Sequence, residues 1–291
     1  MMLQYVDKIK ANISISASKK TANLLDGLYR SIFKGRSLDF DDLRDYVIGD
    51  DSKDIDWKSS IRHGSLLVRR YVAFKRHNIV FIVDSGARFR GVNENNEKKS
   101  ETALYTFGTL SYLVNKNEDE VSCVYTKDNN MYMSPFKLGL QYIEMNLQNL
   151  EKNIENDSSY TINDLIDYTL KTSKRKMIMI VISDIMGLNN IDEKLVRRAT
   201  MAHDMLFVNI NDASMYGEDV FDVEQDSDLP KFITNNKKIL EIENMERERV
   251  KEEKTNMLKK YRVTTGEIGS KSEIVNKLID LLERHNNAVR R

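Results

Sequence analysis

Two aspartates, Asp84 and Asp184, are the side chains of this chain that are best placed to do chemistry. Asp84 follows the apolar run 78–83 (NIVFIV), and Asp184 follows the run 177–183 (MIMIVIS). Runs that are apolar on both faces are typical of central strands covered by helices on each side. In a doubly wound sheet, the ligand crevice lies at the carboxyl ends of strands where the strand order reverses. We therefore expect the two carboxylates to face one another there, and their repulsion calls for a cation or a shared proton.

Other reactive side chains form weaker patterns. The histidines are dispersed without HExxH-like spacing and there are no cysteine pairs, so a zinc site is not expected. Cys123 is the only cysteine, which excludes an internal disulfide, and its apolar surroundings predict a buried thiol. The spacing of Asp54, Asp56 and Lys58 resembles that of restriction-type nucleases, but no acid-bearing strand accompanies it. Neither GxxxxGK[ST] nor GxGxxG occurs, which argues against a nucleotide-hydrolysing motor.

Short apolar runs alternate with longer amphipathic stretches from residue 78 onward, as in a wound α/β sheet. The runs predict strands at 78–83, 121–125, 131–133, 177–182 and 205–210, with a short edge strand near 262–264. The amphipathic stretches predict helices at 101–114, 138–150, 162–171, 195–203 and 241–260, and a last helix after Ser270 or Ser272. The pattern thus indicates an α/β protein with a doubly wound, mostly parallel sheet.

Composition narrows the function classes. The chain has 45 basic residues (lysine and arginine) and 45 acidic residues (aspartate and glutamate). It therefore lacks the net positive charge of most nucleic-acid binders, and we expect protein partners. The start of the chain lacks the apolar core of a signal peptide, and the longest uniformly apolar run is far shorter than the roughly 20 residues that span a bilayer. These features predict a cytoplasmic protein without a membrane span.

The stretch 35–71 (GRSLDFDDLRDYVIGDDSKDIDWKSSIRHGSLLVRRY) has an unusually ordered pattern. Between Asp39 and Asp56 it holds eight aspartates against one arginine and one lysine, and basic residues follow from Arg62 to Arg76. The acidic half either pairs internally with these basic residues or forms a docking face for a basic partner. Aromatic and aliphatic side chains within the stretch predict that it anchors itself on a core; they are Phe40, Tyr46, Ile48, Ile55, Trp57 and Leu66 to Val68.

These residues resemble the domain-of-unknown-function fifty-eight family, which is related to von Willebrand factor A domains. The matching signature comprises Asp39-Phe40, Leu43-Arg44-Asp45-Tyr46, Gly49-Asp50-Asp51, Ile55-Asp56-Trp57-Lys58, Arg62, Gly64, Leu67-Val68 and Tyr71. The resemblance continues through Asp84, a threonine-led helix at Thr161, and Asp184. It implies a von Willebrand factor A-like domain at residues 77–291, preceded by an extension at 1–76 that carries the signature.

The resemblance also implies a metal site. Von Willebrand factor A domains hold a divalent ion through Asp-x-Ser-x-Ser, a later threonine and a later aspartate, to which Asp84, Thr161 and Asp184 correspond. Gly86 and Arg88 occupy the two serine positions, so a site for Mg²⁺ or Mn²⁺ is in question, although Ser85 offers a hydroxyl nearby. The replacement leads to the hypothesis that Arg88 pairs with Asp84 or Asp184 in place of the ion. The alternative is a solvated Arg88.

The resemblance implies a non-catalytic function, since members of this family look like partners or adaptors of MoxR-type AAA+ ATPases in chaperone-like systems. The expected function is thus a protein-binding module with a degenerate metal-ion-dependent adhesion site. One alternative is a metal-dependent phosphoester hydrolase that uses Asp84 and Asp184, although a second carboxylate near Asp84 and a phosphate-stabilising lysine are not evident. A purely structural interaction protein is the other alternative.

Overall fold

The structure is a computed structural model, and it describes residues 3–16, 19–34, 42–70, 76–93, 95–212, 221–222, 227–228 and 237–289. Asp39, Phe40 and Tyr71 of the signature lie outside the described residues. Within these ranges, no helix combines the length and the apolar character that crossing a membrane requires.

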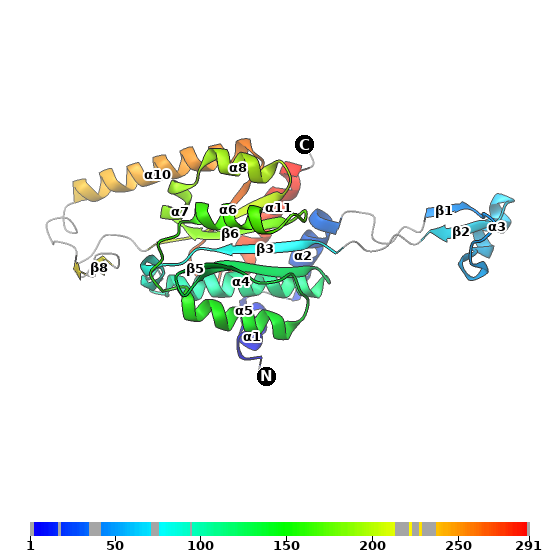
Figure 1. Cartoon of the computed structure of the whole chain (residues 1–291), viewed down its shortest axis with the longest axis horizontal. Coiled ribbons are helices and arrows are strands. Elements are labelled where there is room, and N and C mark those ends of the chain that lie inside the picture. Colours follow the sequence, from blue (N-terminus) through cyan, green and yellow to red (C-terminus); the bar gives the residue numbers. More distant parts are fainter. Residues whose placement is uncertain are drawn as a thin grey trace.

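A six-stranded sheet forms the centre of the chain (Figure 1). Its strands, in spatial order, are β10 (Thr264–Ile268), β7 (Asp204–Ile210), β6 (Ile178–Asp184), β3 (Asn78–Val83), β4 (Glu120–Lys127) and β5 (Asn130–Met133). All neighbours are parallel except β4 and β5. Counted along the chain from β3, this is the order 3-2-1-4-5-6 of a doubly wound sheet with its switch point between β3 and β6. The predicted fold class is confirmed.

Helices cover both faces of the sheet. One face packs against α1 (Gln4–Ser16), α2 (Lys19–Tyr29), α4 (Lys99–Lys116), α5 (Leu140–Asn153) and α11 (Ile274–Val289). The other face packs against α6 (Ile162–Thr172), α7 (Ile185–Asn190), α8 (Glu193–Thr200) and α10 (Lys237–Lys260). The short elements η1 (Arg30–Lys34), η3 (Ala87–Arg90), β8 (Phe221–Asp222) and β9 (Ser227–Asp228) complete this part of the chain.

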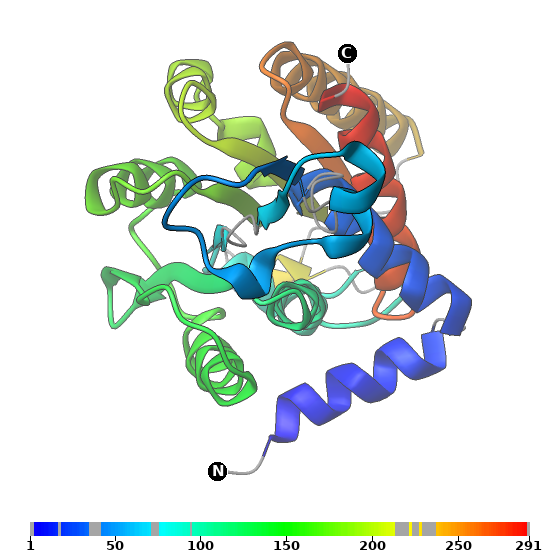
Figure 2. The ribbon, with the colours of Figure 1, turned by 90° about the vertical axis from the view of Figure 1, so that its right-hand side faces the viewer.

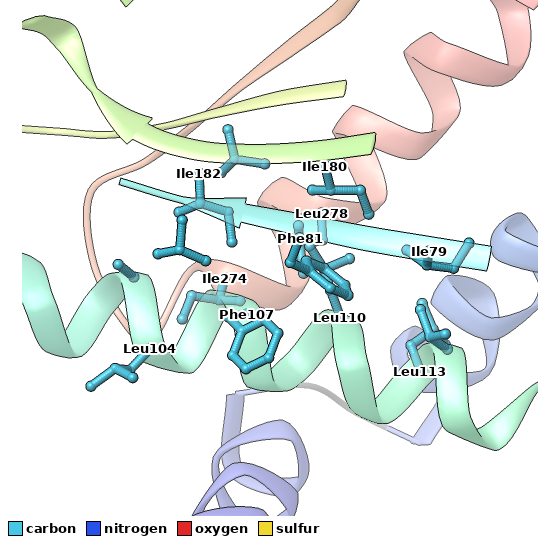
Figure 3. Close-up of a cluster of buried hydrophobic side chains, with 14 of the residues drawn as sticks. Ile79, Phe81, Leu104, Phe107, Leu110, Leu113, Ile180, Ile182, Ile274 and Leu278 are labelled. Atoms are coloured by element: carbon cyan, nitrogen blue, oxygen red, sulfur yellow. The ribbon is translucent and has the colours of Figure 1, made fainter. Parts of the chain in front are cut away.

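Strand β3 is apolar from Ile79 to Val83 because helices cover both of its faces. Ile79 and Phe81 point into the core beneath α4, whereas Val80 and Ile82 belong to the core on the opposite face. Figure 3 shows Phe81 against Phe107 of α4, and their rings meet edge to face at 5.0 Å. Burying each such side chain stabilises the fold by about 1.5–3 kcal/mol. The strand is therefore held rigidly, and so is the residue that follows it.

The first two helices pack on the same core as the sheet, in contact with α4, α5 and α11 (Figure 2). The buried carboxylate of Glu144 accepts hydrogen bonds from the backbone N–H groups of Tyr5 and Val6 at the start of α1, at 2.9–3.1 Å. The Tyr29 hydroxyl at the end of α2 donates to the buried Asp119 at 2.7 Å. Helices α1 and α2 thus belong to the main body, although they lie within the predicted extension.

The signature stretch forms a small unit that we call the ribbon module. It consists of β1 (Asp42–Asp45), η2 (Ser52–Asp54), α3 (Trp57–His63) and β2 (Leu67–Arg70), which Figure 1 shows together. Strands β1 and β2 are antiparallel, and α3 and η2 contact β2.

The sequence pattern located most helices and strands within a few residues. It missed α1, α2 and α7, the elements β1, α3 and β2 of the ribbon module and the short strands β8 and β9, and it placed the last strand two residues too early. Helix α7 spans only six residues, which is too short for a helical period to be recognised in the sequence. The last strand was predicted around the apolar Val263. This residue is buried, but it lies just before β10, which begins at Thr264.

Candidate functional site

Asp84 and Asp184 lie side by side at the carboxyl edge of the sheet. Strands β3 and β6 are parallel neighbours, and Val83 is in register with Ile182. The Asp84 N–H donates to the Ile182 carbonyl at 2.9 Å, which carries the pairing one residue beyond β3. Both carboxylates are buried. The strand ends therefore bring together the two aspartates that the sequence singled out, at the switch point of the sheet.

Arg88 bridges the two aspartates. Its Nη1 donates to Asp184 Oδ1 at 2.9 Å, and its Nη2 donates to Asp84 Oδ2 at 3.0 Å. The guanidinium comes from η3, directly after a turn in which Gly86 has φ +137°. Such a φ strains any residue with a Cβ, so a serine would not fit this turn without a change of backbone. Gly86 and Arg88 thus act together, one shaping the turn and the other filling the space between the carboxylates.

Lys99 is a second buried cation at this site, which the sequence analysis did not identify. Its Nζ donates to Asp184 Oδ2 at 2.8 Å and also to Asp212, and it lies 5.5 Å from the centre of the Phe89 ring. Lys99 is the first residue of α4 and is 3% exposed. Asp212 follows β7, so the rule that located Asp84 and Asp184 would also have located this aspartate. The sequence contained no comparable signal for Lys99.

The two aspartates have opposite ionisation tendencies. Burial raises the pKa of Asp84, and the charge of Asp184 adds to this, while Arg88 opposes it. Burial acts on Asp184 too, but the charges of Lys99 and Arg88 together hold the pKa of Asp184 below its usual value. The Ser183 hydroxyl also donates to Asp84 Oδ2 at 2.5 Å. The cations thus favour a charge on Asp184 more than on Asp84.

The start of helix α7 closes the site from one side. Asp184 caps the helix by accepting the Gly187 N–H at 3.1 Å. A Cβ at Gly187 would collide with Ser183 Oγ and would press on Asp84 Oδ2, so only glycine allows this close approach.

A pocket of about 300 Å³ opens over Arg88. Its walls come from the end of β3, the segment before α6, and α7; the lining residues are Asp84 to Arg88, Asp157 to Ile162, Met186, Gly187 and Asn190. Ser85 is 4% exposed, and its hydroxyl has no hydrogen-bond partner among the described residues. A buried hydroxyl without a partner is costly, so a ligand or water that reached it would gain a hydrogen bond.

The predicted metal ligands do not form a set that fits a divalent ion. Thr161 lines the pocket, but its hydroxyl donates to Asp164 at 2.7 Å within the capping box of α6. Gly86 offers no side-chain oxygen, and both oxygens of Asp184 accept from cations. No cluster of three or more histidine, cysteine or acidic residues suited to a metal occurs in the described part of the chain. Mg²⁺ needs several free oxygens in near-octahedral geometry, which this arrangement does not supply.

The acidic half of the signature serves the ribbon module itself. Asp50 accepts two hydrogen bonds from Arg44, at 2.6 and 2.8 Å, and one from the Val47 N–H. Asp51 caps η2 and Asp56 caps α3. Asp45 accepts from the Ser65 hydroxyl at 3.0 Å, and β1 pairs with the basic strand β2, so the described acidic residues form their bonds locally within the module.

The predicted anchoring of the signature on a core holds only in part. Ile48 is 97% exposed and Trp57 is 61% exposed, whereas Leu67 and Val68 are buried. The module is too small to cover them, because a two-stranded ribbon and one short helix enclose little interior. Gly49 and Gly64 have φ of +113° and +81°, so these signature glycines shape turns. The side chains of Tyr46, Lys58 and Arg62 are at least partly exposed.

Comparisons with known proteins agree with the family resemblance. The family profile described as "Protein of unknown function DUF58" matches residues 42–220, which is more than half of the chain. The match includes both the ribbon module and the crevice. A search of proteins with curated functions finds no match.

Solved structures similar to this chain include the conserved hypothetical protein BatB from Bacteroides thetaiotaomicron. That likeness has a TM-score of 0.46 and 10% identity, and it covers 72% of this chain and 99% of BatB. A von Willebrand factor type A protein from Catenulispora acidiphila has a TM-score of 0.37 and 7% identity, covering 74% of this chain and 43% of that one. Both TM-scores are below 0.5, so these likenesses support no inference about function.

Proposed function

We propose that this chain, which belongs to the DUF58 family of proteins of unknown function, is a non-catalytic protein-binding module whose crevice works without a divalent cation. The observation that carries the proposal is the Arg88 bridge between Asp84 and Asp184. A guanidinium between two carboxylates supplies the positive charge that a metal would otherwise supply. It forms directional hydrogen bonds to both.

The state of the candidate catalytic groups supports a non-catalytic role. Asp84 accepts from Arg88 and Ser183, and Asp184 accepts from Arg88, Lys99 and the start of α7. A nucleophile or general base needs a free lone pair facing the substrate. The hydrogen bonds of these carboxylates leave the phosphoester hydrolase alternative without an observation in its favour.

The pocket over Arg88 suits one polar side chain of a partner protein. Arg88 lines this pocket, and its positively charged side chain is 21% exposed. The free hydroxyl of Ser85 lies in the same pocket. A carboxylate from a partner would accept hydrogen bonds from both, so we propose an acidic side chain as the ligand. Arg88 would then bind the partner's carboxylate directly, without a metal ion between them.

We propose a MoxR-type AAA+ ATPase of a chaperone-like system as the partner, with this chain as its adaptor in the cytoplasm. The family resemblance supports this partner. The single cysteine, Cys123, is buried and unpaired, which fits a reducing compartment.

Calorimetric titration of metal-stripped protein with Mg²⁺ and Mn²⁺ tests the metal-free crevice. We expect no binding by the parent and a gain of binding by Arg88→Ser, which removes the guanidinium from both carboxylates and adds a hydroxyl. Arg90→Ser is the matched control, because Arg90 lies on the same turn but pairs with the exposed Asp157. Binding by the parent that Asp84→Ala abolishes would overturn the proposal.

Co-purification tests the partner. A tagged chain, expressed with a MoxR-type ATPase from the same genome, should retain the hexamer, and Arg88→Gln should weaken this retention while Arg90→Gln should not. Failure of the parent to retain any such ATPase would contradict the adaptor role. Equal retention by Arg88→Gln would show that the crevice is not the contact.

A further inference from the structure

Helix α3 of the ribbon module carries an exposed face that its own fold does not use. Trp57 and Ile61 are spaced by four residues, as are Lys58 and Arg62, so the four side chains share one side of the helix. Trp57 is 61% exposed and Ile61 is 82% exposed. The opposite side contains Ser60, which is buried against β2. Large apolar side chains gathered on the water side of a helix mark an interaction surface.

The helix is held firmly despite its length of seven residues. Asp56 accepts the Ser59 N–H at 2.9 Å at the start of α3, and Gly64 in the left-handed conformation ends it. The Ser60 hydroxyl accepts the Leu67 N–H at 2.8 Å, which ties the helix to β2. A face that is fixed before binding loses little conformational entropy when a partner docks.

The charge of this face determines the kind of partner. Lys58 and Arg62 have no ion-pair partner among the described residues, while Asp50, Asp51 and Asp56 accept hydrogen bonds from Arg44, the Lys53 N–H and the Ser59 N–H. Tryptophan and arginine are the residue types that most often dominate binding energy at interfaces. Cations beside a tryptophan fit carboxylates that surround an apolar pocket.

We propose that the α3 face of Trp57, Lys58, Ile61 and Arg62 docks into an apolar pocket rimmed by carboxylates on another protein. This surface is separate from the crevice, so the chain would have two binding sites of different chemistry. A bilayer is the less suitable partner, because stable membrane binding needs a larger apolar area or a polybasic cluster. A second copy of the chain is also less suitable, because Asp50, Asp51 and Asp56 of its ribbon module already accept local hydrogen bonds.

The chain contains a single tryptophan, so Trp57 fluorescence reports on this face directly. We would select displayed random peptides against the full chain and titrate synthetic copies of the enriched peptides while following the emission. We expect the peptides to combine aromatic or aliphatic residues with Asp or Glu, and their binding to shift Trp57 emission to the blue. Lys58→Glu with Arg62→Glu should weaken binding by about tenfold or more.

The double variant Lys174→Glu with Lys176→Glu is the matched control, because it makes the same charge change on the main body, where both lysines are exposed. It should bind like the parent. Ile61→Ala should also weaken binding, and circular dichroism should show each variant folded. Enriched peptides without acidic residues, or equal binding by Lys58→Glu with Arg62→Glu, would overturn the proposal. The proposal would also be overturned if Trp57 emission shifted to the blue with phosphatidylglycerol vesicles, or with rising protein concentration, but not with acidic peptides.

Discussion

The crevice and the ribbon module both contain an arginine bound to aspartate, but in opposite surroundings. Arg88 joins two carboxylates that are almost fully buried, and the buried Lys99 reinforces them. Arg44 binds Asp50 at the surface, where water competes for both partners. Buried ion pairs are costly to break, whereas exposed pairs contribute little. The same pair of residue types therefore holds the sheet edge together in one region and only shapes a loop in the other.

Asp184→Asn should have the largest effect on stability. The substitution removes the charge that two cations share, and Lys99 would stay buried beside a neutral amide. Removal of one partner from a buried pair costs about 3–5 kcal/mol. Urea unfolding at pH 7 measures the loss. Asp157→Asn, which alters the exposed pair with Arg90, should change the midpoint little. Equal effects of the two variants would contradict the buried network.

Lys99→Met should have the next largest effect, with a loss of about 3 kcal/mol in the free energy of unfolding. Methionine takes the place of the aliphatic stem, but the cation between Asp184 and Asp212 is lost. The neighbouring Lys98 is the natural control, since its side chain is 56% exposed and lies 3.7 Å from Glu155. Lys98→Met should change stability by about 0.5 kcal/mol or less. Similar losses for the two lysines in the same unfolding assay would mean that Lys99 is not structurally special.

The pH dependence of stability should differ in sign between the two aspartates. Asp184 has a lowered pKa, so its contribution is present above the unfolded value of about 3.9 and is lost as the pH falls through the folded pKa. Asp84 has a raised pKa, so its contribution is present below about pH 3.9 and is lost as the pH rises through the folded pKa.

Relative to the parent, the destabilisation by Asp84→Asn should therefore shrink as the pH rises, whereas that by Asp184→Asn should grow. Unfolding curves recorded across the acidic range up to neutral pH measure both trends. Parallel trends for the two variants would show that the carboxylates share one ionisation state.

Gly64→Ala should destabilise the ribbon module by about 1 kcal/mol, because φ at this position is +81° and the glycine ends α3. Faster amide hydrogen exchange at Leu67, whose N–H bonds to Ser60, should report the loss. Gly27→Ala in α2 should instead be neutral or stabilising, since a Cβ at this helical position would meet no neighbouring atom within 4 Å. Unchanged exchange at Leu67 would mean that the module tolerates a different helix end.

Arg44→Met should have the smallest effect. The Arg44–Asp50 pair is exposed, and Asp50 keeps its bond from the Val47 N–H. We expect the unfolding midpoint to equal that of the parent within experimental error. The stability of the ribbon module should depend less on salt concentration in the variant than in the parent. A clear loss of stability would make this pair more like the crevice than its exposure suggests.

The sequence predicted the crevice aspartates because strand ends and strand order follow from local patterns. Runs that are apolar on both faces are typical of central strands, and the residue after such a strand lies at the sheet edge. Asp84 and Asp184 were located in this way, and the replacement of a serine by Arg88 suggested the pairing that the structure contains. Lys99 was missed because a lysine at the start of an amphipathic helix is normally exposed.

The prediction for the signature stretch was correct only for some of its side chains. Its aromatic and aliphatic residues suggested an anchor on a core, but the number of neighbours, and not the residue type, decides burial. Trp57 and Ile61 have the side chains of core residues and lie on the solvent side of α3.

The amino-acid sequence by itself determined the α/β class, most of the strands and helices, and the two aspartates, because all of these depend on hydrophobic periodicity and chain order. The tertiary structure alone decided which cations reach those aspartates, that Thr161 is committed to a helix cap, and which side of α3 faces water. These properties depend on residues that are far apart in the chain, such as Lys99 and Asp184, and no local pattern relates their positions.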